Sequence, residues 1–235
     1  MTEPDDTVSF RLGYVPGVTP GKWARIWAER RPQVPLELIT ATTDEAVELV
    51  RTGEVDAGVV RLPIDRTGLH AIPLYTETTV VVVGKEHLVT AAEQVTLADL
   101  ADEIVLRPLD DTLPWPGDRP GRAAATDPAT TAEAIELVAA GIGLLVVPQS
   151  LARLHHRRDL TYRPLTDAPE SVVVLAWPDA ENTDLMEEFI GIVRGRTVNS
   201  SRTPRRAGTP APGTPAPSKK GAARRPPPRR GTRRR

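Results

Sequence analysis

The stretch that decides the fold is AIELVAAGIGLLVVPQSLA, residues 134–152. Its first half repeats apolar residues at helical spacing, and Gly141 allows the left-handed backbone that ends many helices. Gly143 permits a close approach between a helix and a strand, and Leu144–Val147 is an apolar run typical of a buried strand. The stretch therefore predicts a helix, a tight glycine turn, a strand and a further helix to about His155.

The segments before residue 62 alternate between strand and helix patterns. Three strands are expected, at Val8–Tyr14, Leu36–Thr40 and Val55–Val60. Thr19 and Pro20 predict an N-cap and first residue for one helix, and Thr42 with Glu45 is a capping box for the next, which Gly53 ends. We expect right-handed crossovers and a parallel sheet.

The remaining segments continue this alternation. Further strands are expected at Thr78–Val83, Ile104–Leu106, Leu160–Arg163 and Val172–Trp177. A short helix is capped by Thr96, a longer one begins at Asp127 or at Thr130 and runs to about residue 140, and a last one covers Thr183–Arg194. Four prolines and two glycines predict a loop over 108–121. Because these are more units than one small sheet needs, we expect two α/β lobes.

Composition excludes several classes of protein. The 235 residues are 40% hydrophobic and contain no cysteine, which excludes disulfides, a thiolate nucleophile and cysteine-bound zinc. The apolar runs are far shorter than a membrane-spanning helix needs. The acidic N-terminus lacks the pattern of a secretory signal, so we expect a cytoplasmic protein.

Charge divides the chain into an acidic body and a basic tail. Residues 201–235 carry 12 Lys and Arg and no acid, which leaves 18 basic and 31 acidic residues in 1–200. The tail is rich in proline and is expected to be disordered from residue 199. It could be merely solvated, cover the body, or bind nucleic acid non-specifically. The arginines that would contact nucleic acid are Arg224, Arg225, Arg229, Arg230, Arg233, Arg234 and Arg235.

Three stretches together carry a family resemblance. FRLGYVPG (10–17), VELVRTGEVDAGVV (47–60) and residues 134–152 resemble the effector-binding, or substrate-binding, domain of LysR-type transcriptional regulators. The resemblance implies a type 2 periplasmic-binding-protein fold over 8–198, with two Rossmann-like lobes joined by two crossover strands. Lobe I is expected over about 8–78 and 168–198, and lobe II over about 79–167.

The resemblance also implies a function. We expect a small-molecule effector-binding protein that acts in transcription regulation and pairs as a homodimer. No winged helix-turn-helix precedes the first expected strand, so sequence-specific DNA reading is not transferred. Two alternatives remain open: a nucleic-acid-associated protein that acts through its tail, and an enzyme on the same fold.

The resemblance implies a ligand cleft between the lobes, facing strand ends and helix starts. The expected ligand-binding residues are Tyr14, Pro16, Gly17, Val18, Thr19, Thr42, Thr43, Arg61, Leu62, Thr126, Asp127, Thr130 and Pro148. Capping is an equal alternative for the threonines at helix starts, and a surface salt bridge is an alternative for Arg61. Because Asp127 would repel an anion, a zwitterionic or neutral ligand remains open.

No catalytic residue, metal site or cofactor is expected. The four histidines are scattered, Ser150 lacks a GxSxG context, and no phosphate-binding glycine loop is present. Trp23 and Trp27 share one helix face, for which core or dimer packing is favoured over a ligand platform. Asp56 follows the turn at Gly53, where its carboxylate can accept hydrogen bonds from free backbone N–H groups.

Overall fold

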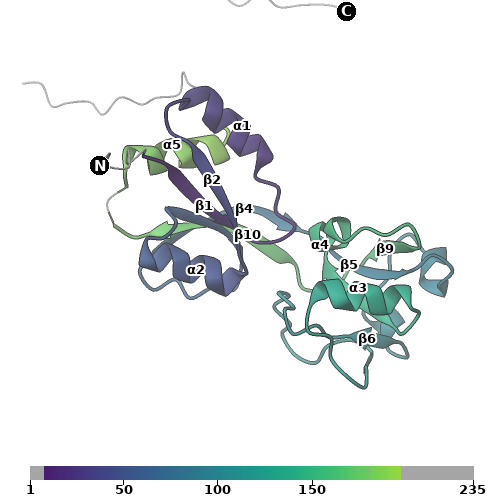
Figure 1. Cartoon of the computed structure of the whole chain (residues 1–235). Coiled ribbons are helices and arrows are strands. Elements are labelled where there is room, and N and C mark those ends of the chain that lie inside the picture. Colours follow the sequence, from purple (N-terminus) through teal and green to yellow (C-terminus); the bar gives the residue numbers. More distant parts are fainter. Residues whose placement is uncertain (1–7, 181, 197–235) are drawn as a thin grey trace, which may run out of the picture. The chain divides into compact units, whose positions relative to one another are not determined.

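The computed structural model describes residues 8–180 and 182–196 (Figure 1). These residues form two five-stranded mixed sheets covered by helices. The α/β fold class with two lobes, which the sequence predicts, is therefore confirmed. The chain passes from one sheet to the other at Thr78 and returns over residues 165–170.

The first sheet has the strand order β2-β1-β3-β10-β4. Its strands are β1 (Phe10–Tyr14), β2 (Leu36–Thr40), β3 (Ala57–Arg61), β4 (Leu69–Glu77) and β10 (Ser171–Pro178). Strand β1 is parallel to β2 and β3, as predicted, whereas β10 is antiparallel to β3 and β4. The edge strand β4 was not predicted, because Pro73 interrupts its pattern. Proline is tolerated there because an edge strand can lose one backbone donor.

Helices cover both faces of this sheet (Figure 1). They are α1 (Gly21–Arg30), α2 (Thr43–Thr52) and α5 (Asp184–Val193). Phe10 of β1 faces α1 and α5, where its ring centroid lies 4.8 Å from that of Trp27 and 5.0 Å from that of Phe189. Three residues later, Gly13 faces Ala46 of α2. Side chains thus alternate between the faces, and burial of both explains the continuous apolar pattern of β3.

The second sheet has the strand order β7-β6-β8-β5-β9. Its strands are β5 (Thr79–Gly84), β6 (Ile104–Leu106), β7 (Arg122–Ala123), β8 (Leu144–Pro148) and β9 (Leu160–Pro164). Val80 and Val82 pack toward α3 (Thr131–Ala139) and α4 (Gln149–Leu154). Val81 and Val83 pack on the other face, beside the 3₁₀ turns η1 (Leu88–Ala91) and η2 (Ala98–Leu100).

Residues 134–152 adopt the predicted helix, turn and strand. Gly141 has a φ of +75°, in the left-handed region that glycine favours. The reason for Gly143 differs from the expectation, since a Cβ there would lie 2.7 Å from the carbonyl oxygen of Ile104. The close approach is therefore between strands β8 and β6 rather than between helix and strand.

Two further expectations are corrected, and a third is decided between its alternatives. Helix α1 has Pro20 as its N-cap and no side-chain capping hydrogen bond, so Thr19 does not cap it. The helix expected after Thr96 is the 3₁₀ turn η2. For the tryptophan face of α1 the structure shows core packing, one of the two favoured alternatives: Trp27 is fully buried, and Trp23 packs partly buried against the same core.

Candidate functional site

A cavity of about 520 Å³ opens where elements of the two sheets meet. Its walls come from the loop between β1 and α1, from the end of β4, and from the start of α4. The lining residues are Gly17, Val18, Thr19, Tyr75, Thr76, Glu77, Thr78, Gln149, Ser150, Arg153 and Leu154. Chain segments of both lobes therefore share one hollow of a size that suits a small organic molecule.

Arg61 connects the walls of this cavity through hydrogen bonds. Its guanidinium donates from Nε to Glu77 Oε2 at 2.8 Å, from Nη1 to the Pro16 carbonyl at 2.8 Å, and from Nη2 to Ser150 Oγ at 2.9 Å. Arg61 is only 2% exposed. It is thus the centre of a buried, charge-assisted network that joins the end of β3 to the first turn of α4.

Gly17 fits closely against this network. Its φ is +86°, and a Cβ built on it would lie 2.7 Å from Ser150 Oγ and 3.1 Å from Arg61 Nη2. At the first of these distances something must shift, and the nearest atom is the end of the Ser150 side chain. The close packing of the loop after β1 against Ser150 and Arg61 therefore depends on the absence of a side chain at residue 17.

Glu77 and Tyr75 bring polar atoms to the wall formed by β4. The Glu77 side chain is 6% exposed and accepts from Arg61 and, at 3.4 Å, from Ser171 Oγ, in both cases through Oε2. Burial raises the pKa of the Tyr75 phenol, and the negative charge of Glu77 raises it further. Tyr75 therefore stays neutral at physiological pH, and Glu77 is the acidic side chain of this wall.

The expected ligand residues are only partly brought together. Gly17, Val18 and Thr19 line the cavity, and the Pro16 carbonyl binds Arg61 beside it. The guanidinium of Arg61 is hydrogen-bonded to protein groups. Its ion-pair partner Glu77 is buried, so the pair is not the surface salt bridge that was the alternative for Arg61.

The other expected residues lie outside the lining. Thr42 and Thr130 cap α2 and α3 by accepting from Glu45 N and Glu133 N. Thr43 Oγ1 is buried and has no hydrogen-bond partner among the described residues. The remaining expected residues are also absent from the lining: Tyr14 and Pro148 end β1 and β8, Leu62 follows β3, and Thr126 and Asp127 are exposed in the loop before α3.

The walls formed by β4 and α4 were not predicted from the sequence. Tyr75 and Glu77 were missed because β4 was not predicted. Gln149, Ser150 and Arg153 were missed because the expected site ended at Pro148, before the helix that follows it. One signal was available: a helix begins directly after Pro148, so its first turn must lie at the same sheet edge as Pro148.

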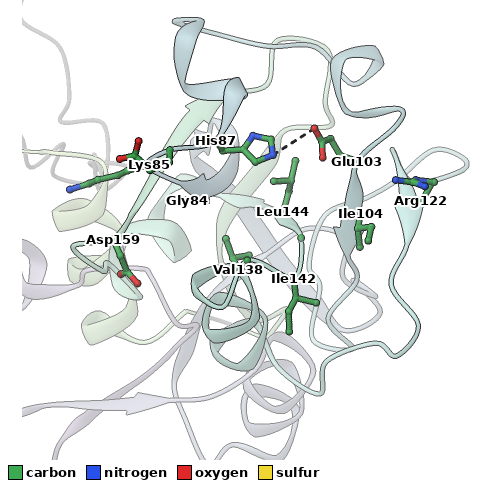
Figure 2. A pocket seen from close by; sticks show the side chains of 13 residues that line it. Gly84, Lys85, His87, Glu103, Ile104, Arg122, Val138, Ile142, Leu144 and Asp159 are labelled. Carbon is green, nitrogen blue, oxygen red and sulfur yellow. Dashed lines mark ion pairs between the residues drawn. The ribbon is translucent and has the colours of Figure 1, made fainter.

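A second hollow, of about 660 Å³, lies at the opposite end of β5 (Figure 2). Lys85 and His87 follow β5 there, and His87 Nε2 lies 3.6 Å from Glu103 Oε1. Ile104 and Ile142 add apolar side chains to the lining of the same hollow. The second lobe alone forms this hollow, and it contains none of the expected ligand residues.

The described part of the chain contains no cluster of metal-binding side chains and no membrane-spanning helix. Over residues 8–180 and 182–196, no three His, Asp or Glu side chains are grouped so that they could hold a metal ion. Within the same residues, every helix is too short or too polar to cross a membrane.

Comparison with known families assigns the chain to one of them. The model of the LysR substrate binding domain matches residues 9–197. The chain belongs to this family. The LysR substrate-binding domain thus covers both sheets and the cavity that they share.

Curated relatives of this LysR domain are regulators of transcription. The HTH-type transcriptional regulator AlsR of Bacillus subtilis (strain 168) is 28% identical over 183 residues, covering 72% of this chain and 59% of that protein. A probable hydrogen peroxide-inducible genes activator of Mycobacterium avium is 31% identical over 154 residues, covering 60% and 49%. The chain therefore spans about half to three fifths of the length of these relatives.

Solved structures support the same fold for the LysR domain. The BenM effector binding domain with its effector benzoate is 25% identical, covers 79% of this chain and 90% of its own, and gives a TM-score of 0.67. The oxidised form of OxyR is 19% identical with a TM-score of 0.65, covering 80% of this chain and 93% of its own, and is similar in fold.

The expected tail arginines, Arg224 to Arg235, lie outside the described residues.

Proposed function

We propose that this LysR substrate-binding domain binds a small-molecule effector in the cavity lined by Gly17–Thr19, Tyr75–Thr78 and the first turn of α4, and that binding regulates transcription. The observation that carries the proposal is the shared cavity, whose walls come from both lobes and are linked through Arg61. The similarity to a BenM domain whose name includes its effector benzoate supports a small ligand.

The geometry favours ligand-linked closure. An effector that contacts both Gly17–Thr19 and Gln149–Ser150 gains its full contacts only when the two walls are close together. Such a ligand shifts the population toward that arrangement by its differential affinity. The Arg61–Ser150 hydrogen bond connects the same walls, so we infer that ligand and Arg61 favour one closed state together.

Oxidation is a less favoured input than binding. Some relatives carry the name of hydrogen peroxide-inducible activators, but these 235 residues contain no cysteine, so no thiol within them can respond to peroxide.

We further propose that the chain has no catalytic activity, since its relatives are transcriptional regulators. We also propose that it acts in the cytoplasm, where bacterial transcription occurs, and as a dimer.

A thermal-shift panel of carboxylic acids, amino acids and aromatic acids tests the proposal. A ligand at about 100 times its Kd adds roughly 2.7 kcal/mol of stability, which raises the melting temperature by about 5–10 °C in a domain of this size. Thr76→Trp, which places a large side chain in the cavity from an exposed position, is expected to abolish the shift. Leu88→Trp, at a site that is 87% exposed and outside the cavity, serves as the matched control.

The proposal fails if no compound in the panel shifts the melting temperature. It also fails if Thr76→Trp retains the full shift, because the ligand would then bind elsewhere, such as the hollow between Lys85 and Ile142 (Figure 2).

A further inference from the structure

We propose that the effector is a small carboxylic acid that also carries an amine or hydroxyl group, with this donor bound by Glu77 Oε1 and the carboxylate directed to Arg153. The inference rests on the proposed function, because it concerns the same cavity. It goes further by stating the chemical class that the cavity walls select.

The first step concerns the unused oxygen of Glu77. Both hydrogen bonds that Glu77 accepts from described side chains go to Oε2. Oε1 accepts none from them, and it is also not among the fully buried polar atoms without a partner, which are Thr43 Oγ1, Arg107 Nε and Thr112 Oγ1. Oε1 is therefore still reachable by solvent, on a residue that lines the cavity and whose side chain is only 6% exposed.

Such an oxygen discriminates between ligands. In the empty cavity, water can donate to Oε1. A ligand that fills this end of the cavity displaces the water, and one without an N–H or O–H group leaves a charged acceptor desolvated and unpaired. Sites with a buried polar group reject analogues that cannot satisfy it. A hydrogen-bond donor is therefore required of a ligand that occupies the Glu77 end.

The second step concerns charge. Arg61 and Glu77 neutralise one another in their buried pair, which leaves Arg153 as the uncompensated charged side chain among the lining residues. Arg153 is exposed, makes no ion pair with any described residue, and donates only from Nε to Tyr162 Oη at 3.4 Å. Its terminal nitrogens are thus available for a carboxylate, the group that a guanidinium binds best.

Two matched series of probes test the donor requirement on the full chain by isothermal titration calorimetry. One series is succinate, malate and aspartate, and the other is benzoate, 3-hydroxybenzoate and 3-aminobenzoate. In the series that fits the cavity, we expect the donor-bearing acids to bind about tenfold or more tightly than the donor-free acid. In the aliphatic series, the hydroxyl of malate and the ammonium of aspartate distinguish a neutral donor from a charged one, whereas both aromatic donors are neutral near pH 7.

Variants locate the two contacts. Glu77→Gln is expected to remove most of the preference for donor-bearing over donor-free acids. Arg153→Gln is expected to weaken every carboxylate probe about tenfold, whereas Arg158→Gln, at an exposed residue outside the cavity, is expected to leave affinity unchanged. If Glu77→Gln fails to fold because Arg61 loses its partner, the probe series on the natural chain still test the donor requirement. The Arg153 variant still tests the carboxylate contact.

The outcomes separate the inference from the proposed function. If succinate or benzoate binds as tightly as its donor-bearing analogues, or if Arg153→Gln leaves the affinity of every acid unchanged, the inference is overturned while effector binding stands. If none of these acids and no compound of the thermal-shift panel binds, the proposed function fails and the inference fails with it.

Discussion

At Gly17 the backbone lies so close to Ser150 and Arg61 that a Cβ there would force one of these side chains or the loop to move. Gly17→Ala is expected to push the loop away from Ser150 or to rotate the serine, and in either case to break the Arg61–Ser150 hydrogen bond. The expected loss is about 1–3 kcal/mol of unfolding free energy from overpacking, beyond the strain of a positive φ. Chemical denaturation measures it.

Gly68→Ala is the matched control for this variant. Gly68 also has a positive φ, +72°, but a Cβ there would meet nothing within 4 Å. It therefore carries the backbone strain without the steric contact. Equal losses in the two variants would contradict the close packing inferred at Gly17.

Arg61 shows how burial changes the value of an ion pair. Arg61→Ala leaves the Glu77 carboxylate buried without its partner, which is expected to cost about 3–5 kcal/mol of stability. The exposed pair of Arg51 and Asp65, at 2.9 Å, gives the comparison. Arg51→Ala is expected to cost about 1 kcal/mol or less, because water screens it. Urea unfolding of both variants tests this, and similar losses would contradict the structural role of Arg61.

At the scale of elements, the turn into β8 depends on Gly143. Gly143→Ala would place Cβ against the Ile104 carbonyl, a backbone atom that cannot turn aside, so strands β6 and β8 must separate. We expect a loss of about 1–3 kcal/mol from the steric conflict. Gly141→Ala, where a Cβ would meet open space, isolates the cost of the left-handed backbone alone. A milder effect of the Gly143 variant in thermal melts would contradict this explanation.

The capping box of α2 predicts a dependence on pH. Hydrogen bonds from the Thr42 backbone and hydroxyl hold the pKa of Glu45 below its ordinary value of 4.5. A pKa that is lower in the folded state means that the ionised carboxylate stabilises the helix above about pH 4.5, and that this contribution is lost as the pH falls through the folded pKa. Glu45→Gln cannot titrate.

We therefore expect the melting-temperature difference between the natural chain and Glu45→Gln to be largest near pH 7 and to shrink below pH 4.5. Glu48→Gln, on the same helix but outside the box, is the control and should show a smaller difference at pH 7. A gap for Glu45→Gln that widens on acidification would be inconsistent with the hydrogen bonds of Thr42.

At the scale of the whole molecule, closure of the two lobes can be measured directly. Because the chain has no cysteine, Glu48→Cys on α2 and Ala132→Cys on α3 give two exposed sites for spin labels. Saturation with the acid that stabilises the protein most is expected to narrow the distribution of distances between the labels and to shift it. The same labels on a chain that also carries Thr76→Trp provide the control. An unchanged distribution at saturation would exclude ligand-linked closure.

Local features of the sequence were sufficient for most elements. The threonine and glutamate of the α2 capping box, the glycine that ends that helix, and the glycine turn before β8 each have a short-range physical cause, and each forms as predicted. Asp56 also accepts a backbone N–H, as expected, but at 2.7 Å from Arg11, which is 45 residues away in the chain. Strand β4 escaped prediction because Pro73 interrupts its pattern and its pairing partner, β10, lies about 100 residues later in the chain.

The candidate site was predictable only in part, for the same reason. Gly17 to Thr19 follow a strand and precede a helix, so local sequence identifies them as a loop at the sheet edge. That Arg61 is occupied by Glu77, Pro16 and Ser150 depends on which segments meet across the two lobes. The sequence by itself determined most of the elements and the family, because spacing, caps and glycines act over a few residues. Only the tertiary structure decided which polar groups are buried together and which remain available to a ligand, because desolvation and pairing depend on neighbours distant in the chain.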